Sequence, residues 1–321
     1  MDNKNTKTCW VITEGIAGTE NQCIGVAEAM GISPTIKRVK LNTPWKQLTP
    51  YLRIFNGLAI SKDGDEITAP WPDIAICSGR KSIPAALHIK KASKGKTCVV
   101  QIQDPRCNPK LFDLVFIPIH DPTRGENVHL ITGGLNRITR DKLKNESKKF
   151  APFFKDDKKQ KIAVLIGGKS KAHDFTDASI KKLCEQLKNL SQNYYLMITA
   201  SRRTGEKRIN YLKTELSNNE AIYFYDGEGE NPYFAFMERA DYILCTQDSV
   251  SMISEALTTA KPTYIIEMEG GGKRIDKFHE HILNEGYAKM FDGTLKAYDA
   301  KPLNETKRVA EIIENFIENR Q

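Results

Sequence analysis

Residues 246–257 have the sequence TQDSVSMISEAL, and KPTYII follows a little further along the chain. The apolar run Tyr242–Cys245 comes directly before it. The order is therefore buried strand, polar turn, helix and second buried strand, which is the pattern of a βαβ unit. Asp248 or Ser249 can cap a helix that begins near Val250. The first N–H groups of such a helix point at the crevice beyond the preceding strand, where phosphates bind readily.

A family resemblance extends from this stretch. The pattern D-S-V-S-M-x-S-E-A-x-x-x-x-K-P, with EGGG at 269–272 and RIDKFH at 274–279, resembles the mitochondrial fission ELM-like family of bacteria and plants. Its S-E-A-x-x-x-x-K-P core is also similar to the donor-site helix of the two-domain GT-B glycosyltransferases. In those enzymes the glutamate binds the nucleotide ribose, so the resemblance implies that Glu255 accepts hydrogen bonds from ribose hydroxyls.

Composition limits the class of protein. The chain has 321 residues, 40% of them apolar and 27% charged, which is typical of a folded globular protein with room for two domains. No apolar run approaches the roughly 20 residues that cross a bilayer, and no signal-peptide core follows Met1–Lys7. We therefore expect a cytoplasmic protein, able to lie peripherally at the inner face of the membrane. The seven cysteines contain no C-x-x-C pair and are expected to be reduced core thiols.

The fold class follows from repetition of the strand, small-residue loop and helix pattern. Such a repeat favours parallel sheets with helices on both faces, and therefore two doubly wound Rossmann-like α/β domains facing a central cleft, as in GT-B proteins. Expected strands are 9–12, 34–41, 73–77, 97–103, 114–117, 128–132, 161–166, 194–198, 222–224, 242–245 and 263–266.

A lysine-rich, weakly apolar stretch at about 140–160 marks the expected boundary. We predict an N-terminal, acceptor-side domain at 1–150 and a C-terminal, nucleotide-sugar donor-side domain at 151–321. The last helix, about 304–319, can cross back to the first domain, as is common in GT-B-like proteins.

Candidate donor-side residues follow the strands of the second domain. Gly167 and Gly168 would let the backbone approach a diphosphate that Lys169 could neutralise, although GGKS lacks the Walker spacing; a tight structural turn is the alternative. Arg202 and Arg203 offer planar donors for phosphate oxygens, unless one is simply exposed and the other salt-bridged. Ser249, Ser251 and Glu255 complete the predicted site.

The first domain carries two candidate bases in the loop TEGIAGTENQ, residues 13–22. GT-B enzymes keep an acceptor-side loop at this place, and Glu14 or Glu20 could deprotonate an acceptor hydroxyl.

Several other chemistries are not supported. His279 and His281 are two residues apart, which does not place them on one helix face as H-E-x-x-H does, so we predict no metal site. No G-x-S-x-G or G-x-G-x-x-G motif follows a strand, which argues against a serine hydrolase and a standard dehydrogenase. The net charge of +8 lacks the aromatic-interleaved basic strands of nucleic-acid modules, so we expect no nucleic-acid partner.

Three functions remain open. The first is a metal-independent glycosyltransferase that uses a nucleotide-sugar as substrate, holds no tight cofactor, and transfers the sugar to an envelope or lipid-linked acceptor beside an anionic membrane. The second is a nucleoside-diphosphate-sugar epimerase on the same fold. The third is a non-catalytic interaction module, which the family's association with fission implies.

Overall fold

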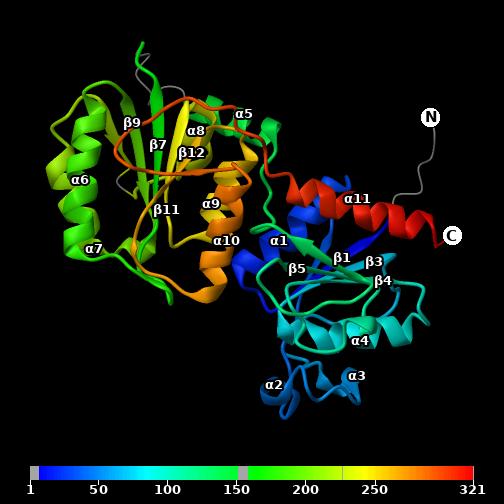
Figure 1. Cartoon of the computed structure of the whole chain (residues 1–321). Helices are drawn as coiled ribbons and strands as arrows, with labels where there is room; N and C mark the ends of the chain where they lie inside the picture. The colour runs from blue at the N-terminus through cyan, green and yellow to red at the C-terminus, as the bar shows by residue number, and fades with distance from the viewer. Residues whose placement is uncertain (1–6, 151–157, 226, 321) are drawn as a thin grey trace. The chain divides into compact units, whose positions relative to one another are not determined.

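The structure is a computed structural model that describes residues 7–150, 158–225 and 227–320. The chain divides into two compact units. The first contains Met1–Arg137 together with Asn304–Gln321, and the second contains Ile138–Leu303. Each unit has a six-stranded sheet with helices packed on both faces (Figure 1). The predicted class, two doubly wound α/β domains of the GT-B type, is confirmed.

The first sheet has the order β2-β1-β3-β4-β5-β6, and all its strand pairs are parallel. Neighbouring residues of β1 alternate between two cores, because successive side chains of a strand point to opposite faces. Val11 lies in the core beneath α1 and α11, and Ile12 lies in the core beneath α4. The elements are β1 (Cys9–Thr13), α1 (Ala17–Ala29), β2 (Thr35–Arg38), α2 (Trp45–Leu48), α3 (Asn56–Ala59), β3 (Ile74–Ser78), α4 (Ile83–Ala92), β4 (Cys98–Ile102), β5 (Leu114–Pro118), β6 (Val128–Ile131) and α11 (Glu305–Glu318).

The second sheet has the order β10-β9-β7-β11-β12-β14 and is also parallel throughout. Helices α6 and α7 cover one face, and α8, α9 and α10 cover the other (Figure 1). The elements are α5 (Arg140–Lys149), β7 (Lys161–Ile166), β8 (His173–Asp174), α6 (Asp177–Ser191), β9 (Tyr195–Ala200), α7 (Glu206–Leu216), β10 (Ile222–Phe224), α8 (Tyr233–Arg239), β11 (Tyr242–Thr246), α9 (Val250–Thr258), β12 (Thr263–Ile266), β13 (Glu269–Gly270), α10 (Lys273–Asn284) and β14 (Lys289–Met290).

The division between the units falls earlier than the lysine-rich stretch suggested. Helix α5 packs against α8, and Leu143 and Phe150 are buried in the core of the second unit. The charged residues of α5 form its solvent-facing side. The predicted boundary at 150/151 lies next to residues 151–157, which are outside the described ranges. The last helix, α11, packs against α1 in the first unit, so the chain crosses between units twice.

Most predicted strands lie within two or three residues of the observed ones. The expected strand at 34–41 ends sooner, at Arg38, and the following excursion forms two short helices, α2 and α3. All seven cysteines are free thiols, as expected, and all except half-buried Cys107 lie in the core. Over the described residues, no helix is long and apolar enough to cross a membrane.

Candidate functional site

The topology of the second sheet marks one edge as a ligand site. The chain runs from β7 to β9 and β10 on one side, then returns to β11 and β12 on the other. The strand order therefore reverses between β7 and β11, and ligands of open α/β sheets bind outside the carboxyl ends of the strands at such a switch point. Gly167 and Gly168 follow β7 there, and Asp248 and Ser249 follow β11.

The two glycines permit a close approach of three loops. A Cβ on Gly167 would lie 2.1 Å from an Asp248 carboxylate oxygen, and one on Gly168 would lie 2.1 Å from the Arg203 carbonyl oxygen. The N–H of Gly167 donates to the Thr246 hydroxyl at 2.7 Å, and that of Gly168 donates to Asp248 at 3.1 Å. Both N–H groups therefore already have acceptors within the protein. Diphosphate binding by this backbone stays a prediction, and the tight-turn role is present in the structure.

Asp248 joins the loops at the switch point. Its side chain is fully buried, accepts a hydrogen bond from Thr246 at 2.7 Å, and lies 2.8 Å from a guanidinium nitrogen of Arg203. Arg203 is 44% exposed, so one edge of its guanidinium faces solvent. Arg202, its neighbour, is exposed. The two arginines thus differ, with one fixed by an internal carboxylate and one available at the surface of the second unit.

Helix α9 begins where the sequence predicted. Ser249 has extended backbone geometry, and its hydroxyl accepts from the Met252 N–H at 3.3 Å, so Ser249 is the N-cap. Ser251 is exposed in the first turn. Glu255 lies four residues after Ser251, a spacing that places both side chains on the same face of the helix.

The Glu255 carboxylate is partly buried rather than exposed. It accepts a 2.5 Å hydrogen bond from the Tyr233 hydroxyl of α8. Burial raises the pKa of Glu255 above its ordinary value, while the Tyr233 hydrogen bond and the nearby Lys142 ammonium oppose that shift. The second unit therefore holds a carboxylate in a position where ionisation is disfavoured, which is common at functional sites.

Lys169 lies in a different setting. It is exposed and pairs with exposed Asp174 at 3.2 Å. Exposed ion pairs of this kind are weak, so the ammonium can exchange partners at little cost.

The first sheet also reverses its order, between β1 and β3, and Glu14 follows β1 at that point. Its carboxylate forms an ion pair with Lys81, from the turn after β3. Glu20 instead lies in α1, where Arg38 donates two hydrogen bonds to it, at 2.8 and 2.9 Å. The Arg38 hydrogen bonds hold the pKa of Glu20 below its ordinary value, so Glu20 is a poor proton acceptor and Glu14 is the better candidate.

Sequence reasoning missed a pair of buried histidines in the second unit. The ring centroids of His173 and His279 are 6.0 Å apart, and His279 is 4% exposed. Both ring nitrogens of His173 and Nε2 of His279 are without a hydrogen-bond partner among the described residues. Their sequence separation of more than a hundred residues gave no warning that they meet. In the described ranges, no group of three or more His, Cys, Asp or Glu side chains is arranged to hold a metal ion.

A pocket of about 510 Å³ opens beside α6 and β12, lined by Phe175, Ser179, Lys182, residues 266–270 and Phe291. No predicted site residue lines this pocket, within the part of the chain that the structure describes. Of the predicted donor residues, Gly167, Gly168 and Ser249 instead follow the strands that meet at the β7/β11 switch point.

The fold and the switch-point geometry define a GT-B-like protein. The mitochondrial fission ELM1 family matches residues 17–317, and the chain belongs to that family. It is 25% identical to the mitochondrial fission protein ELM1 of Arabidopsis thaliana, over 94% of this chain and 88% of that protein. It is 28% identical to an uncharacterised protein of Rickettsia prowazekii, over 95% of this chain and 97% of that protein.

Solved structures show the same fold. MurG of Acinetobacter baumannii superposes with a TM-score of 0.54 at 14% identity, covering 96% of this chain and 99% of that one. A UDP-GlcNAc 2-epimerase of Neisseria meningitidis bound to UDP-GlcNAc superposes with a TM-score of 0.50 at 15% identity, covering 98% and 92%. At these identities the likeness concerns the fold alone.

Proposed function

We propose that this chain binds a nucleotide-sugar at the β7/β11 switch point of its second unit and transfers the sugar to an envelope or lipid-linked acceptor without a tightly bound metal. The observation that carries the proposal is the Glu255 carboxylate. It lies on the face of α9 that also carries Ser251, on a helix whose N-terminus begins at the switch point. A partly buried carboxylate is suited to two vicinal ribose hydroxyls, because these would donate the hydrogen bonds that water supplies to an exposed carboxylate.

The diphosphate would lie at the N-terminus of α9, next to Ser251 and within reach of Arg202. The first N–H groups of a helix lack intrahelical acceptors, and the helix dipole favours an anion at that end. Arg202 is exposed and can adjust to the phosphates, whereas Arg203 is held by Asp248. These groups would stabilise the nucleoside diphosphate as it leaves with the electron pair of the broken sugar–phosphate bond.

The acceptor role is assigned to the first unit. The acceptor hydroxyl oxygen attacks the anomeric carbon, and its proton passes to a base for which we favour Glu14. The Lys81 ion pair orients the Glu14 carboxylate at the carboxyl end of β1. The net charge of +8 would favour an acceptor at an anionic membrane surface.

The decisive experiment measures ligand binding before activity. Thermal shift with UDP, GDP, CDP and ADP, followed by calorimetric titration of the best ligand, tests whether the second unit takes a nucleotide. UDP is the first choice, because a fold neighbour is described as bound to UDP-GlcNAc. A Glu255→Gln variant should lose binding. If no nucleoside diphosphate or nucleotide-sugar binds, the proposal is wrong and a non-catalytic interaction module becomes the better reading.

An epimerase is the second candidate, because a structure of similar fold is a UDP-GlcNAc 2-epimerase. An epimerase converts the nucleotide-sugar without an acceptor. Product that forms from nucleotide-sugar alone would favour the epimerase, and product that requires an added acceptor would favour the transferase.

A further inference from the structure

The first unit exposes an unusual cluster of apolar side chains. We define the apolar tip as residues 44–59, which contain α2 and α3. Among the described residues, eight large apolar side chains are exposed, and five of them belong to the apolar tip: Leu48, Tyr51, Ile54, Phe55 and Leu58. Phe55 is 70% exposed and Tyr51 is 77% exposed. Scattered exposed apolar residues are ordinary, but a contiguous group of this kind marks an interaction site.

Hydrogen bonds hold the backbone of the apolar tip in place. The indole N–H of Trp45 donates to the Ile54 carbonyl oxygen at 2.9 Å, and Asn42 Nδ2 donates to the Leu58 carbonyl oxygen at 3.0 Å. Thr49 and Ala59 are buried and anchor the segment to the unit. Figure 1 shows α2 and α3 beyond α4, on the side away from the first sheet. The apolar side chains are therefore exposed on a folded support.

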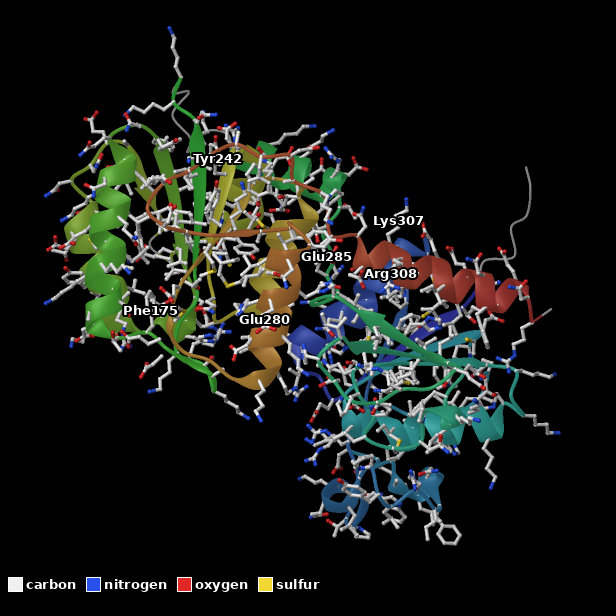
Figure 2. The ribbon with its side chains drawn as sticks, viewed as in Figure 1. Phe175, Tyr242, Glu280, Glu285, Lys307 and Arg308 are labelled. Carbon is white, nitrogen blue, oxygen red and sulfur yellow. The ribbon has the colours of Figure 1, made fainter. Side chains whose placement is uncertain are left out.

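Phe55 itself has a left-handed backbone conformation, with φ of 50°. A bulky residue rarely adopts this conformation, and such strain concentrates at functional positions. Figure 2 shows aromatic side chains projecting into solvent at the end of the unit where α2 and α3 lie.

The stretch of sequence that contains the apolar tip carries charge of one sign. Residues 29–62 contain no Asp or Glu, while they include six cationic side chains. Of these, Lys46 and Arg53 belong to the apolar tip and are exposed. Arg38 is paired with Glu20, and the acidic residues at 63, 65 and 66 come only after the segment. An apolar surface with cations at its margin fits an anionic lipid surface, in which acyl chains take the apolar groups and headgroups take the cations.

We propose that the apolar tip is a membrane-docking device that inserts Tyr51, Phe55 and Leu58 into the interface of an anionic bilayer. The apolar tip would be the surface through which the proposed glycosyltransferase contacts the membrane. The proposed function supplies only the purpose of this contact. A second copy of the chain fits the surface less well, because two apolar tips would bring their cations together. Docking requires no nucleotide, so its failure and the failure of nucleotide binding are separately visible.

The test is cosedimentation of the full chain with mixed phosphatidylcholine–phosphatidylserine vesicles and with pure phosphatidylcholine vesicles. Phe55→Ser with Leu58→Ser should weaken binding to the mixed vesicles by at least about tenfold, since each side chain loses its transfer into the interface. Lys46→Gln with Arg53→Gln should weaken it by about tenfold at low salt, and less at high salt. The matched control is Leu130→Ser with Met290→Ser, which removes two exposed apolar side chains elsewhere and should change nothing.

A depth measurement separates insertion from charge attraction. Tryptophan placed by Phe55→Trp should be quenched by lipids brominated on their acyl chains, as an inserted side chain would be. Equal vesicle binding by the serine double variant and the wild type, or absence of quenching, overturns the proposal. Sedimentation equilibrium without lipid adds a further check, because a dimer that the serine double variant dissolves would assign the surface to a second copy and overturn membrane docking.

Discussion

Glu255→Gln should separate ligand binding from folding. The substitution keeps the length and shape of the side chain, and the glutamine oxygen can still accept the Tyr233 hydrogen bond that the carboxylate accepts at 2.5 Å. It removes only the negative charge. In the proposed complex the carboxylate accepts from ribose hydroxyls, and hydrogen bonds to a charged group contribute about 1.5–3 kcal/mol. The expected loss is therefore roughly 10- to 150-fold in nucleotide affinity.

Unlike nucleotide affinity, the folding stability of Glu255→Gln should not fall below that of the wild type. Burial raises the pKa of Glu255, so the folded protein disfavours the ionised form. For a carboxyl group with a raised pKa, the folded state binds the proton more tightly than the unfolded state, and stability falls as pH rises through that interval. Glutamine lacks this fall. The variant should be as stable as the wild type near pH 4.5, and equally or more stable near pH 8.

The assay combines calorimetric titration with UDP and urea unfolding at several pH values. Tyr233→Phe is the matched control, because it removes the hydroxyl that Glu255 accepts from but leaves the charge. It should lower stability by about 1–3 kcal/mol through the lost buried hydrogen bond, and affect affinity less than Glu255→Gln does. A 2′,3′-dideoxy nucleotide should bind the wild type about as weakly as the intact nucleotide binds Glu255→Gln.

Two results would refute the reasoning. Equal affinity of wild type and Glu255→Gln for the intact nucleotide would remove Glu255 from the site. Unfolding of Glu255→Gln at neutral pH, with Tyr233→Phe similarly damaged, would make the pair a purely structural contact.

Three further predictions concern stability. Asp248→Asn should lower the free energy of unfolding in urea by about 2–3 kcal/mol, because it removes the buried charge that pairs with Arg203 and leaves one oxygen for the two donors at Gly168 and Thr246; Asp174→Asn, at an exposed pair, is the control and should unfold at the wild-type midpoint. Burial is the main cause, and nearby His173 a lesser one, that lowers the pKa of His279 from 6.5 to about 4. As pH falls, His279 is therefore protonated in the unfolded state before it is protonated in the folded state. Stability should drop between these values, by about 2 kcal/mol near pH 5, and His279→Gln should flatten that drop; parallel pH profiles would refute it. Truncation after Leu303 should unfold the first unit, because α11 buries Val309, Ile313 and Ile317, a loss on the order of 5–9 kcal/mol; a soluble product with unchanged circular dichroism per residue would contradict this.

The predicted parts of the fold were those with local causes. The apolar runs that became β7 and β11 and the cap at Ser249 were evident, because strand burial and helix capping depend on neighbouring residues. The position of the domain division was not, because α5 is polar over most of its surface and Leu143 is its one buried residue.

The candidate site divides in the same way. The sequence by itself determined which residue types follow the strands at the switch point. Two glycines follow one strand, and a capped helix with a carboxylate follows another. Only the tertiary structure decided how they are used. Asp248 occupies the space that Gly167 leaves free, and the Arg203 backbone occupies the space at Gly168. Arg203 pairs with the Asp248 carboxylate, and Tyr233 holds Glu255. Each of these partners lies on a different strand–loop–helix unit, and pairing across a sheet is set by strand order, which no local pattern in the chain encodes.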